Sequence, residues 1–204
     1  MYVLLIAAWL MSPIFPLNPT HQDTLNHVNI HLTAGISGPT RLSTPGPEFT
    51  AKYELMFHHP FVLRTAFDYR YGKMKSVLYP EGKFHGTTIS AEIFYYKGTY
   101  KSTGYVGMGM VYVNNFIRLP QKLSESLYET DHIVDIYMLS KLGYRITLGL
   151  RFHKNYSLEL AITEVSPTLV TKTQLSENKY SNKYENIRLN NVRFTLGYLI
   201  PLRW

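Results

Sequence analysis

The last thirteen residues, Val192 to Trp204, constrain the fold of this chain more than any other stretch. They read V-R-F-T-L-G-Y-L-I-P-L-R-W, and apolar residues occupy every second position. A period of two is typical of a β-strand with one apolar face. The apolar set comprises Val192, Phe194, Leu196, Tyr198, Ile200, Leu202 and Trp204. The segment therefore predicts an amphipathic strand, too long for a typical soluble sheet, that ends on an aromatic residue.

Seven earlier segments alternate in the same way, so the chain predicts eight strands in all. After the N-terminus, no segment has the run of about 20 apolar residues that a membrane helix needs. Aromatic residues make up 14% of the chain, with 17 Tyr, which suits strands better than helices. The seven strands are expected at His27–Ile36, Phe49–Phe57, Phe61–Tyr71, Thr88–Tyr95, Tyr105–Val113, Leu142–Phe152 and Tyr156–Thr163.

The connections between these strands alternate between long and short. The first, Ser37–Glu48, is long, and the last, the polar stretch Ser166–Asn190, is expected to be a long loop. Short turns, such as the one at His153–Asn155, separate the long connections. The longest connection, Asn114 to about Lys141, could carry an extra strand from Ile133. Membrane-spanning barrels have an even strand count, short turns on one side and long loops on the other. The pattern therefore predicts an all-β fold, an eight-stranded antiparallel up-and-down transmembrane β-barrel.

Alternation alone does not tell whether the apolar face points inward or toward lipid. A soluble barrel would be apolar inside and would spread Lys and Glu over its outer face. Here the polar face combines small residues with Arg and carboxylates, which pair well in a narrow enclosure. The interior of an eight-stranded barrel is just wide enough for side chains to fill it. We therefore predict a charge network in the lumen, formed by Lys52, Glu54, Arg64, Asp68, Arg70, Glu92, Arg145, Arg151, Glu159 and Arg193.

These features resemble the small eight-stranded outer-membrane barrels of bacteria, of the OmpX, OmpW and opacity-protein type. The resemblance implies location in the outer membrane, contact with outer-membrane lipid and lipopolysaccharide, and long loops that face outside. It also implies that the barrel-assembly machinery recognises the closing strand with its apolar residues Phe194, Leu196, Tyr198, Ile200, Leu202 and Trp204. Pro201 departs from the pattern because it cannot donate to a strand ladder, so we expect it near the end of the strand.

Residues 1–22 are interpreted as a signal peptide, and residues 23–204 as the barrel domain. An apolar run extends from Val3 to Leu10 and is followed by Pro13 and Pro16. The run is too short for a transmembrane helix, and the prolines interrupt any continuation of it. A membrane anchor remains the alternative, because no Lys or Arg precedes the run and no clean cleavage site follows it.

The sequence offers little for catalysis. The absence of Cys excludes disulfides and thiol nucleophiles. His27 and His31 lie about 13 Å apart along a strand, too far to chelate one metal. Ser157 is near His153 in sequence, but that histidine is expected in a periplasmic turn, away from lipid A. We therefore predict no cofactor, no metal site and no enzyme. The net charge of +7 does not predict nucleic-acid binding, because most lysines are dispersed over turns and loops.

Three functions remain open. The leading hypothesis is a non-enzymatic barrel with a charge-plugged lumen, whose loops serve envelope integrity, adhesion or another contact with an extracellular partner. A small pore or a lateral conduit for apolar solutes, as the OmpW type implies, is the alternative. An enzyme that modifies lipid A is the third.

Overall fold

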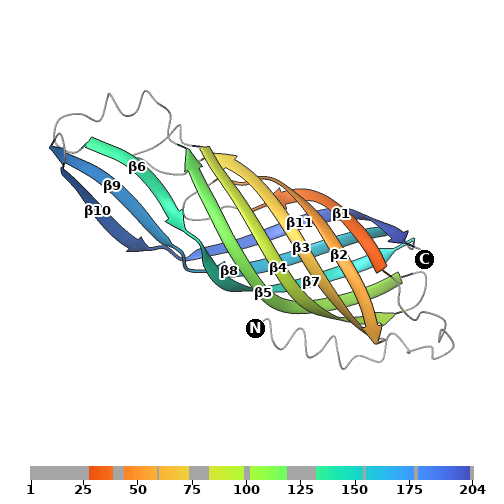
Figure 1. Ribbon diagram of the computed structural model, residues 1–204. Coiled ribbons are helices and arrows are strands. Elements are labelled where there is room, and N and C mark those ends of the chain that lie inside the picture. The colour runs from red at the N-terminus through yellow and green to blue at the C-terminus, as the bar shows by residue number, and fades with distance from the viewer. Residues whose placement is uncertain are drawn as a thin grey trace.

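The computed structural model describes residues 28–38, 44–58, 60–73, 83–98, 102–118, 132–153, 155–176 and 179–202. Eight strands close into an antiparallel barrel in the order β1-β11-β8-β7-β5-β4-β3-β2 (Figure 1). They are β1 (Val28–Ser37), β2 (Gly46–His58), β3 (Phe61–Lys73), β4 (Lys83–Gly98), β5 (Ser102–Arg118), β7 (Lys141–Phe152), β8 (Tyr156–Val165) and β11 (Leu189–Leu202). The predicted eight-stranded antiparallel barrel is confirmed. Among the described residues, no helix is long and apolar enough to cross a membrane.

The last strand closes the barrel against the first, as its length and alternation suggested. β11 pairs with β1 from Val28 opposite Leu202 to Ser37 opposite Arg193, and with β8 on its other side. Pro201 lies opposite Asn29, one position before the strand ends, so its missing N–H falls where the ladder stops. Trp204 and the expected signal peptide, residues 1–22, lie outside the described residues.

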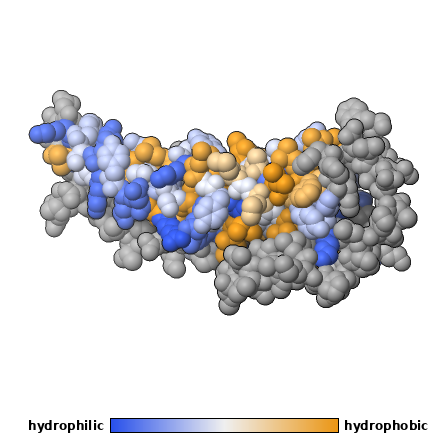
Figure 2. All heavy atoms as spheres, turned by 90° about the horizontal axis from the view of Figure 1, so that it is seen from below, coloured by the Kyte–Doolittle hydropathy of each residue, from blue (hydrophilic) through white to orange (hydrophobic). Residues whose placement is uncertain are grey.

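The apolar faces of the strands point outward. Phe67 and Ile93 are 49% and 54% exposed, whereas Arg64 and Glu92, on the opposite faces of the same two strands, are each 1% exposed. This inverts the arrangement of a soluble barrel and requires a lipid surrounding. Figure 2 shows the hydrophobic residues over the barrel and hydrophilic residues toward the end that β9 and β10 occupy in Figure 1.

Aromatic side chains mark the end of the barrel with the short turns. Phe61 contacts Tyr95 with ring centroids 5.7 Å apart, and Phe152 stacks on Tyr156 at 6.1 Å. Tyr156 in turn packs edge-on against Tyr198 at 5.4 Å. Such a ring of aromatic side chains is typical of a barrel at the interface between membrane and water.

Beyond the opposite end of the barrel, three further strands form a separate antiparallel sheet in the order β10-β9-β6. They are β6 (His132–Leu139), β9 (Thr168–Ser176) and β10 (Lys179–Asn186), and Figure 1 shows them projecting past the barrel strands. The extra strand expected from Ile133 is confirmed as β6, but the prediction of a loop at Ser166–Asn190 was wrong. All eight residues of β10 are exposed, so neither of its faces needs an apolar row and no alternation marks it.

Two barrel strands are also longer than predicted. β4 begins at Lys83 rather than near Thr88, and β5 continues to Arg118 rather than ending at Val113. In the added part of β4 the inner residue Phe84 is apolar and buried, as are Val111 and Val113 next to the added part of β5. With apolar residues on the inner face, the sequence there lacks the contrast between an apolar outer face and a polar inner one that reveals a barrel strand.

Candidate functional site

The centre of the lumen is the guanidinium of Arg64, which projects inward from β3. Its Nε and Nη2 donate to Glu54 Oε1 at 2.9 and 2.5 Å, and its Nη1 donates to Glu159 Oε1 at 2.9 Å. It also lies 3.9 Å from the ring centroid of Phe94 and 5.2 Å from that of Tyr105. Arg64 is therefore held by two carboxylates and by the faces of two aromatic rings, a combination that suits an enclosed Arg.

The residues around Arg64 form the lower tier of the lumen, on the side of the short turns. Lys52 forms an ion pair with Glu159, and Arg151 Nη2 donates to Glu54 Oε2 at 2.8 Å. Tyr105 donates to Glu159 at 2.6 Å. Three cations and two carboxylates thus share one network, and each carboxylate accepts from more than one donor.

A second network, the upper tier, lies further toward the β10-β9-β6 sheet. Asp68 accepts from Arg145 Nη2 at 2.5 Å and from Arg193 Nη1 at 2.6 Å, so one carboxylate joins β3 to β7 and β11. Arg193 also donates to Glu48 at 2.8 Å, and Arg145 lies 3.4 Å from Glu92. Here two cations meet three carboxylates, which offsets the excess of one cation in the lower tier. The ten charged groups of the two tiers are therefore neutral as a set.

The two tiers contain nine of the ten charged residues predicted for the lumen. The tenth, Arg70, is buried nearer the end of the lumen that faces this sheet, where its Nη2 donates to the backbone carbonyls of Gly38 at 2.7 Å and Thr44 at 3.3 Å. Arg151 is the least enclosed of the network, with 16% of its side chain exposed. Glu48 belongs to the upper tier although the sequence assigned it to a loop; it shares the parity of Lys52, and that signal could have placed it.

Lumen aromatics were also missed, and glycines on the neighbouring strand make room for them. Phe94 lies opposite Gly107, and Tyr105 opposite Gly149. A methyl group at either glycine would overlap the facing ring. Because Gly107 and Gly149 have no side chain, the rings of Phe94 and Tyr105 can lie flat against the backbone of the neighbouring strand. Tyr96 stacks on Tyr105 with ring centroids 4.9 Å apart. The signal was available, because Phe94 and Tyr96 continue the parity of Glu92.

Ser157 has a histidine partner, but a different one from the neighbour that the sequence offered. Its Oγ lies 2.6 Å from Nε2 of His31, a hydrogen bond between β8 and β1, whereas His153 lies in the turn after β7. His31 Nδ1 is 3.8 Å from Glu54 and 3.9 Å from Glu159, beyond hydrogen-bond length. Both His31 and Ser157 are at most 1% exposed. Among the described residues, no group of His, Asp and Glu could hold a metal ion.

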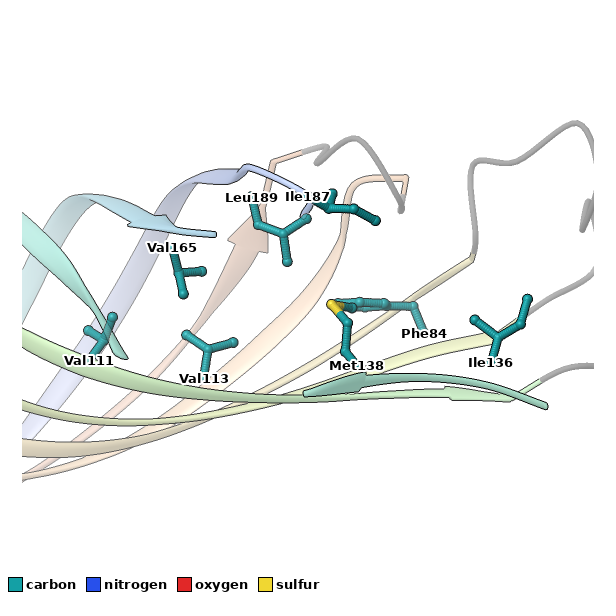
Figure 3. Close-up of a cluster of buried hydrophobic side chains, with 8 residues drawn as sticks. All are labelled: Phe84, Val111, Val113, Ile136, Met138, Val165, Ile187 and Leu189. Carbon is teal, nitrogen blue, oxygen red and sulfur yellow. The ribbon is translucent and has the colours of Figure 1, made fainter. Parts of the chain in front are cut away.

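Above the charged tiers, the barrel mouth is filled by an apolar cap (Figure 3). Side chains from several strands point toward one another there, and two of them, Ile136 and Met138, come from β6 of the outer sheet. The cap consists of Phe84, Val111, Val113, Ile136, Met138, Val165, Ile187 and Leu189. A cavity of about 40 Å³ lies between the cap and the upper tier and is lined by both charged and apolar residues. It has room for a water molecule or two, so the mouth is packed rather than open.

The overall arrangement is shared with solved structures of low sequence identity. OprG, an outer membrane protein from Pseudomonas aeruginosa, matches with a TM-score of 0.59 and 11% identity, covering 87% of this chain and 96% of that one. The outer membrane protein AlkL, solved in lipid bilayers, matches with a TM-score of 0.54 and 10% identity, covering 95% and 99%. The fold is that of a small outer-membrane β-barrel. The predicted resemblance and location agree with it. No protein-family model matches the sequence, and a search of curated proteins found no significant match.

Proposed function

We propose that this outer-membrane barrel is a non-enzymatic anchor that holds an interaction surface outside the cell, with its lumen closed to solutes. The observation that carries the proposal is the β10-β9-β6 sheet. All eight residues of β10 are exposed, and within the part of the chain that the structure describes β10 is an edge strand that pairs with β9 alone. An exposed edge and its side chains are a ready surface for a partner, and Lys179 and Lys183 on this strand limit self-association.

The apolar cap supports this role, because it connects the sheet to the barrel. Ile136 and Met138 of β6 pack with barrel residues in the cap, and Leu169 of β9 packs against it. The orientation of the sheet relative to the barrel is thereby fixed by buried apolar contacts rather than by a chain connection alone.

The closed lumen supports the second part of the proposal. The charged groups of both tiers are paired, and most of them are nearly inaccessible to solvent. Ion passage would require several buried ion pairs to separate. The buried Ser157–His31 pair argues against an enzyme in the lumen, since a substrate would have to reach side chains that are almost wholly enclosed.

The test removes the β9–β10 hairpin, residues 168–186, and replaces it with a short Gly-Ser linker in cells that display the protein. Heat-dependent gel migration establishes that the barrel still folds. We expect binding to host cells or matrix to fall to the level of cells without the protein, while the intact protein confers binding. Equal binding by the two forms would contradict the proposal. A change in lipid A mass between cells with and without the protein would contradict its non-enzymatic part.

One observation favours a second candidate, a conduit for apolar solutes. The upper end of the lumen is apolar above a charged floor, so displacement of the cap would open a site for an apolar solute without a straight passage through the barrel. Uptake of an apolar fluorescent probe by cells with the intact protein, and its loss on Val113→Asp, would support this candidate. Uptake equal to that of cells without the protein would remove it.

A further inference from the structure

The two faces of the β10-β9-β6 sheet differ in chemistry. One face packs against the apolar cap through Ile136 and Met138 of β6 and Leu169 of β9. Successive residues of a strand point to opposite sides of a sheet, so Val170 and Lys172 of β9 lie on the other face. We call this second face the tyrosine face. The residues that share it with Val170 and Lys172 are Asp135 and Tyr137 on β6 and Tyr180, Asn182 and Tyr184 on β10.

The tyrosines supply the apolar surface of this face. Tyr180 and Tyr184 lie on the edge strand β10 and are 48% and 63% exposed, whereas Tyr137 on β6 is partly buried. Tyr137 and Tyr184 flank Val170 in one row, and Val170 itself is fully buried, so it adds no aliphatic patch. The two tyrosines of β10 therefore present flat apolar rings to a ligand, each with a hydroxyl group at its tip.

The positions of these two rings are set by β10 and by a neighbouring lysine. Lys172 Nζ lies 4.4 Å from the ring centroid of Tyr180, a cation–π contact that restrains this ring. Tyr180 and Tyr184 are four residues apart, which is about 13 Å along the strand. This distance exceeds the width of one sugar ring, so the two tyrosines can contact two separate sugars of one chain.

The row between the two tyrosines is polar and electrically balanced. Asp135, Lys172 and Asn182 pair in register across the three strands, and Asp135 and Asn182 are exposed. The carboxylate and the ammonium group cancel in charge, while Lys183 and Glu185 of β10 point to the opposite face. A ligand of the tyrosine face therefore needs no net charge, and hydroxyl groups match the donors and acceptors that it offers.

From these observations we propose that the tyrosine face binds a neutral oligosaccharide. Tyr180 and Tyr184 stack on the apolar C–H faces of two sugars, and the polar row between them hydrogen-bonds to hydroxyl groups. Separate rings with a polar row between them fit a sugar chain better than the contiguous apolar core of a protein interface. This inference rests on the proposed function, which places the sheet outside the cell, and it names the class of ligand.

The test measures binding of the purified full-length protein to immobilised oligosaccharides, in a detergent without a sugar headgroup. The panel contains lacto-N-tetraose, chitotetraose and maltotetraose, with a chondroitin sulfate tetrasaccharide as the charged counterpart. We expect the wild type to bind at least one neutral member more tightly than the sulfated one. Equal or tighter binding of the sulfated member, or no binding of any neutral member, would overturn the proposal.

Variants on β10 test the assignment of the rings. Tyr180→Ala and Tyr184→Ala should each weaken binding about tenfold because a stacking contact is lost, and Tyr184→Phe should keep most of the affinity. The matched control is Lys183→Gln, which neighbours Tyr184 but lies on the opposite face and should bind as the wild type does. Limited proteolysis at the wild-type rate verifies that the hairpin is folded. Unchanged binding by a folded Tyr184→Ala protein, or an equal loss in Lys183→Gln, would overturn the proposal.

Binding to cells separates this inference from the proposed function. Periodate oxidation of target-cell glycans should lower binding as far as Tyr184→Ala does. If removal of residues 168–186 abolishes cell binding while both tyrosine variants bind cells as the intact protein does, the proposed function stands and this inference fails. If the hairpin is dispensable for cell binding but the purified protein binds a neutral oligosaccharide through Tyr180 and Tyr184, the proposed function fails and the oligosaccharide site stands.

Discussion

The two halves of the lumen are closed by opposite kinds of chemistry. Toward the short turns, ten charged groups in two tiers neutralise one another through ion pairs, and Arg64 alone contacts two carboxylates and two aromatic rings. Toward the β10-β9-β6 sheet, the cap uses only apolar side chains, of which Ile136 and Met138 come from β6 and Ile187 from the link between β10 and β11. In the lower half, the closing contacts are made between barrel strands. In the upper half, they also involve β6 of the β10-β9-β6 sheet.

The difference has an energetic consequence. A buried ion pair gains little over a well-packed apolar pair, but removing one partner leaves an uncompensated charge and is costly. An apolar contact is lost in proportion to the area and volume removed. In the charged half, removal of a single ionic partner should therefore lower the free energy of unfolding strongly, even where the change in side-chain size is small. In the apolar half, the loss should grow gradually with the area and volume removed. The following experiments separate these two responses.

The largest effect is expected from Arg64→Leu. This change removes the shared partner of Glu54 and Glu159 and leaves two buried carboxylates with fewer donors. We expect the free energy of unfolding to fall by about 3–5 kcal/mol. Urea titration of the protein in phospholipid vesicles measures it, with Lys183→Gln as the surface control. A loss below about 1 kcal/mol would contradict the prediction, because it would show that Glu54 and Glu159 do not depend on Arg64 as a shared partner.

A somewhat smaller and more local effect is expected from Phe84→Ala in the cap. Loss of this buried ring, which is 2% exposed, should cost about 3 kcal/mol and loosen the contact between the sheet and the barrel. Limited proteolysis should then cut near the β9–β10 turn while the barrel strands stay protected. If cleavage is no faster than in the wild type, the cap does not hold the sheet.

Gly107→Ala tests how closely the ring of Phe94 packs against the backbone of β5 in the charged half. The new methyl group overlaps Phe94 and should cost about 1–3 kcal/mol. Phe94→Leu in the same chain removes the obstructing ring edge and should recover part of the loss. Both variants are compared by urea titration in vesicles. Additive losses in the double variant would mean that the glycine is needed for some reason other than space for this ring.

The smallest effect on stability is expected from Arg188→Gln. This arginine pairs with Glu164 on the outer surface, where solvent screens the interaction, so the free energy of unfolding should stay close to that of the wild type. The contrast with Arg64→Leu then measures what enclosure adds to an arginine–carboxylate pair. A loss as large as that of Arg64→Leu would remove the distinction between the two environments.

Most of the barrel could be predicted from the sequence because each membrane strand faces two different solvents. Lipid outside and a polar lumen inside impose a strict period of two. Once the composition of the polar face assigns it to the lumen, parity places Arg64, Asp68 and Arg193 on that face. Parity also places Phe94 and Tyr96 inside the barrel. The prediction missed them because it assigned only polar residues to the inner face.

The features that the sequence did not predict lie where a strand no longer separates lipid from a polar lumen. β10 meets water on both faces and carries no pattern, so Lys179–Asn186 could not be recognised as a strand. The cap residues Val111 and Val113 are apolar on an inner face that was expected to be polar. The pairing of Ser157 with His31 joins residues 126 positions apart, and no local signal marks such a contact.

The long-range ion pairs of the upper tier bear on how the chain enters the membrane. Arg193 on the last strand neutralises Glu48, 145 residues earlier, and Asp68, 125 residues earlier. Until β11 is in place these carboxylates lack that partner, and an open, partly formed sheet would expose uncompensated charge to hydrocarbon. Insertion strand by strand is therefore penalised, and the barrel is favoured to enter the bilayer only when its final strand has joined the first. The ion pairs of the lumen therefore favour insertion of a closed barrel over insertion of an open sheet.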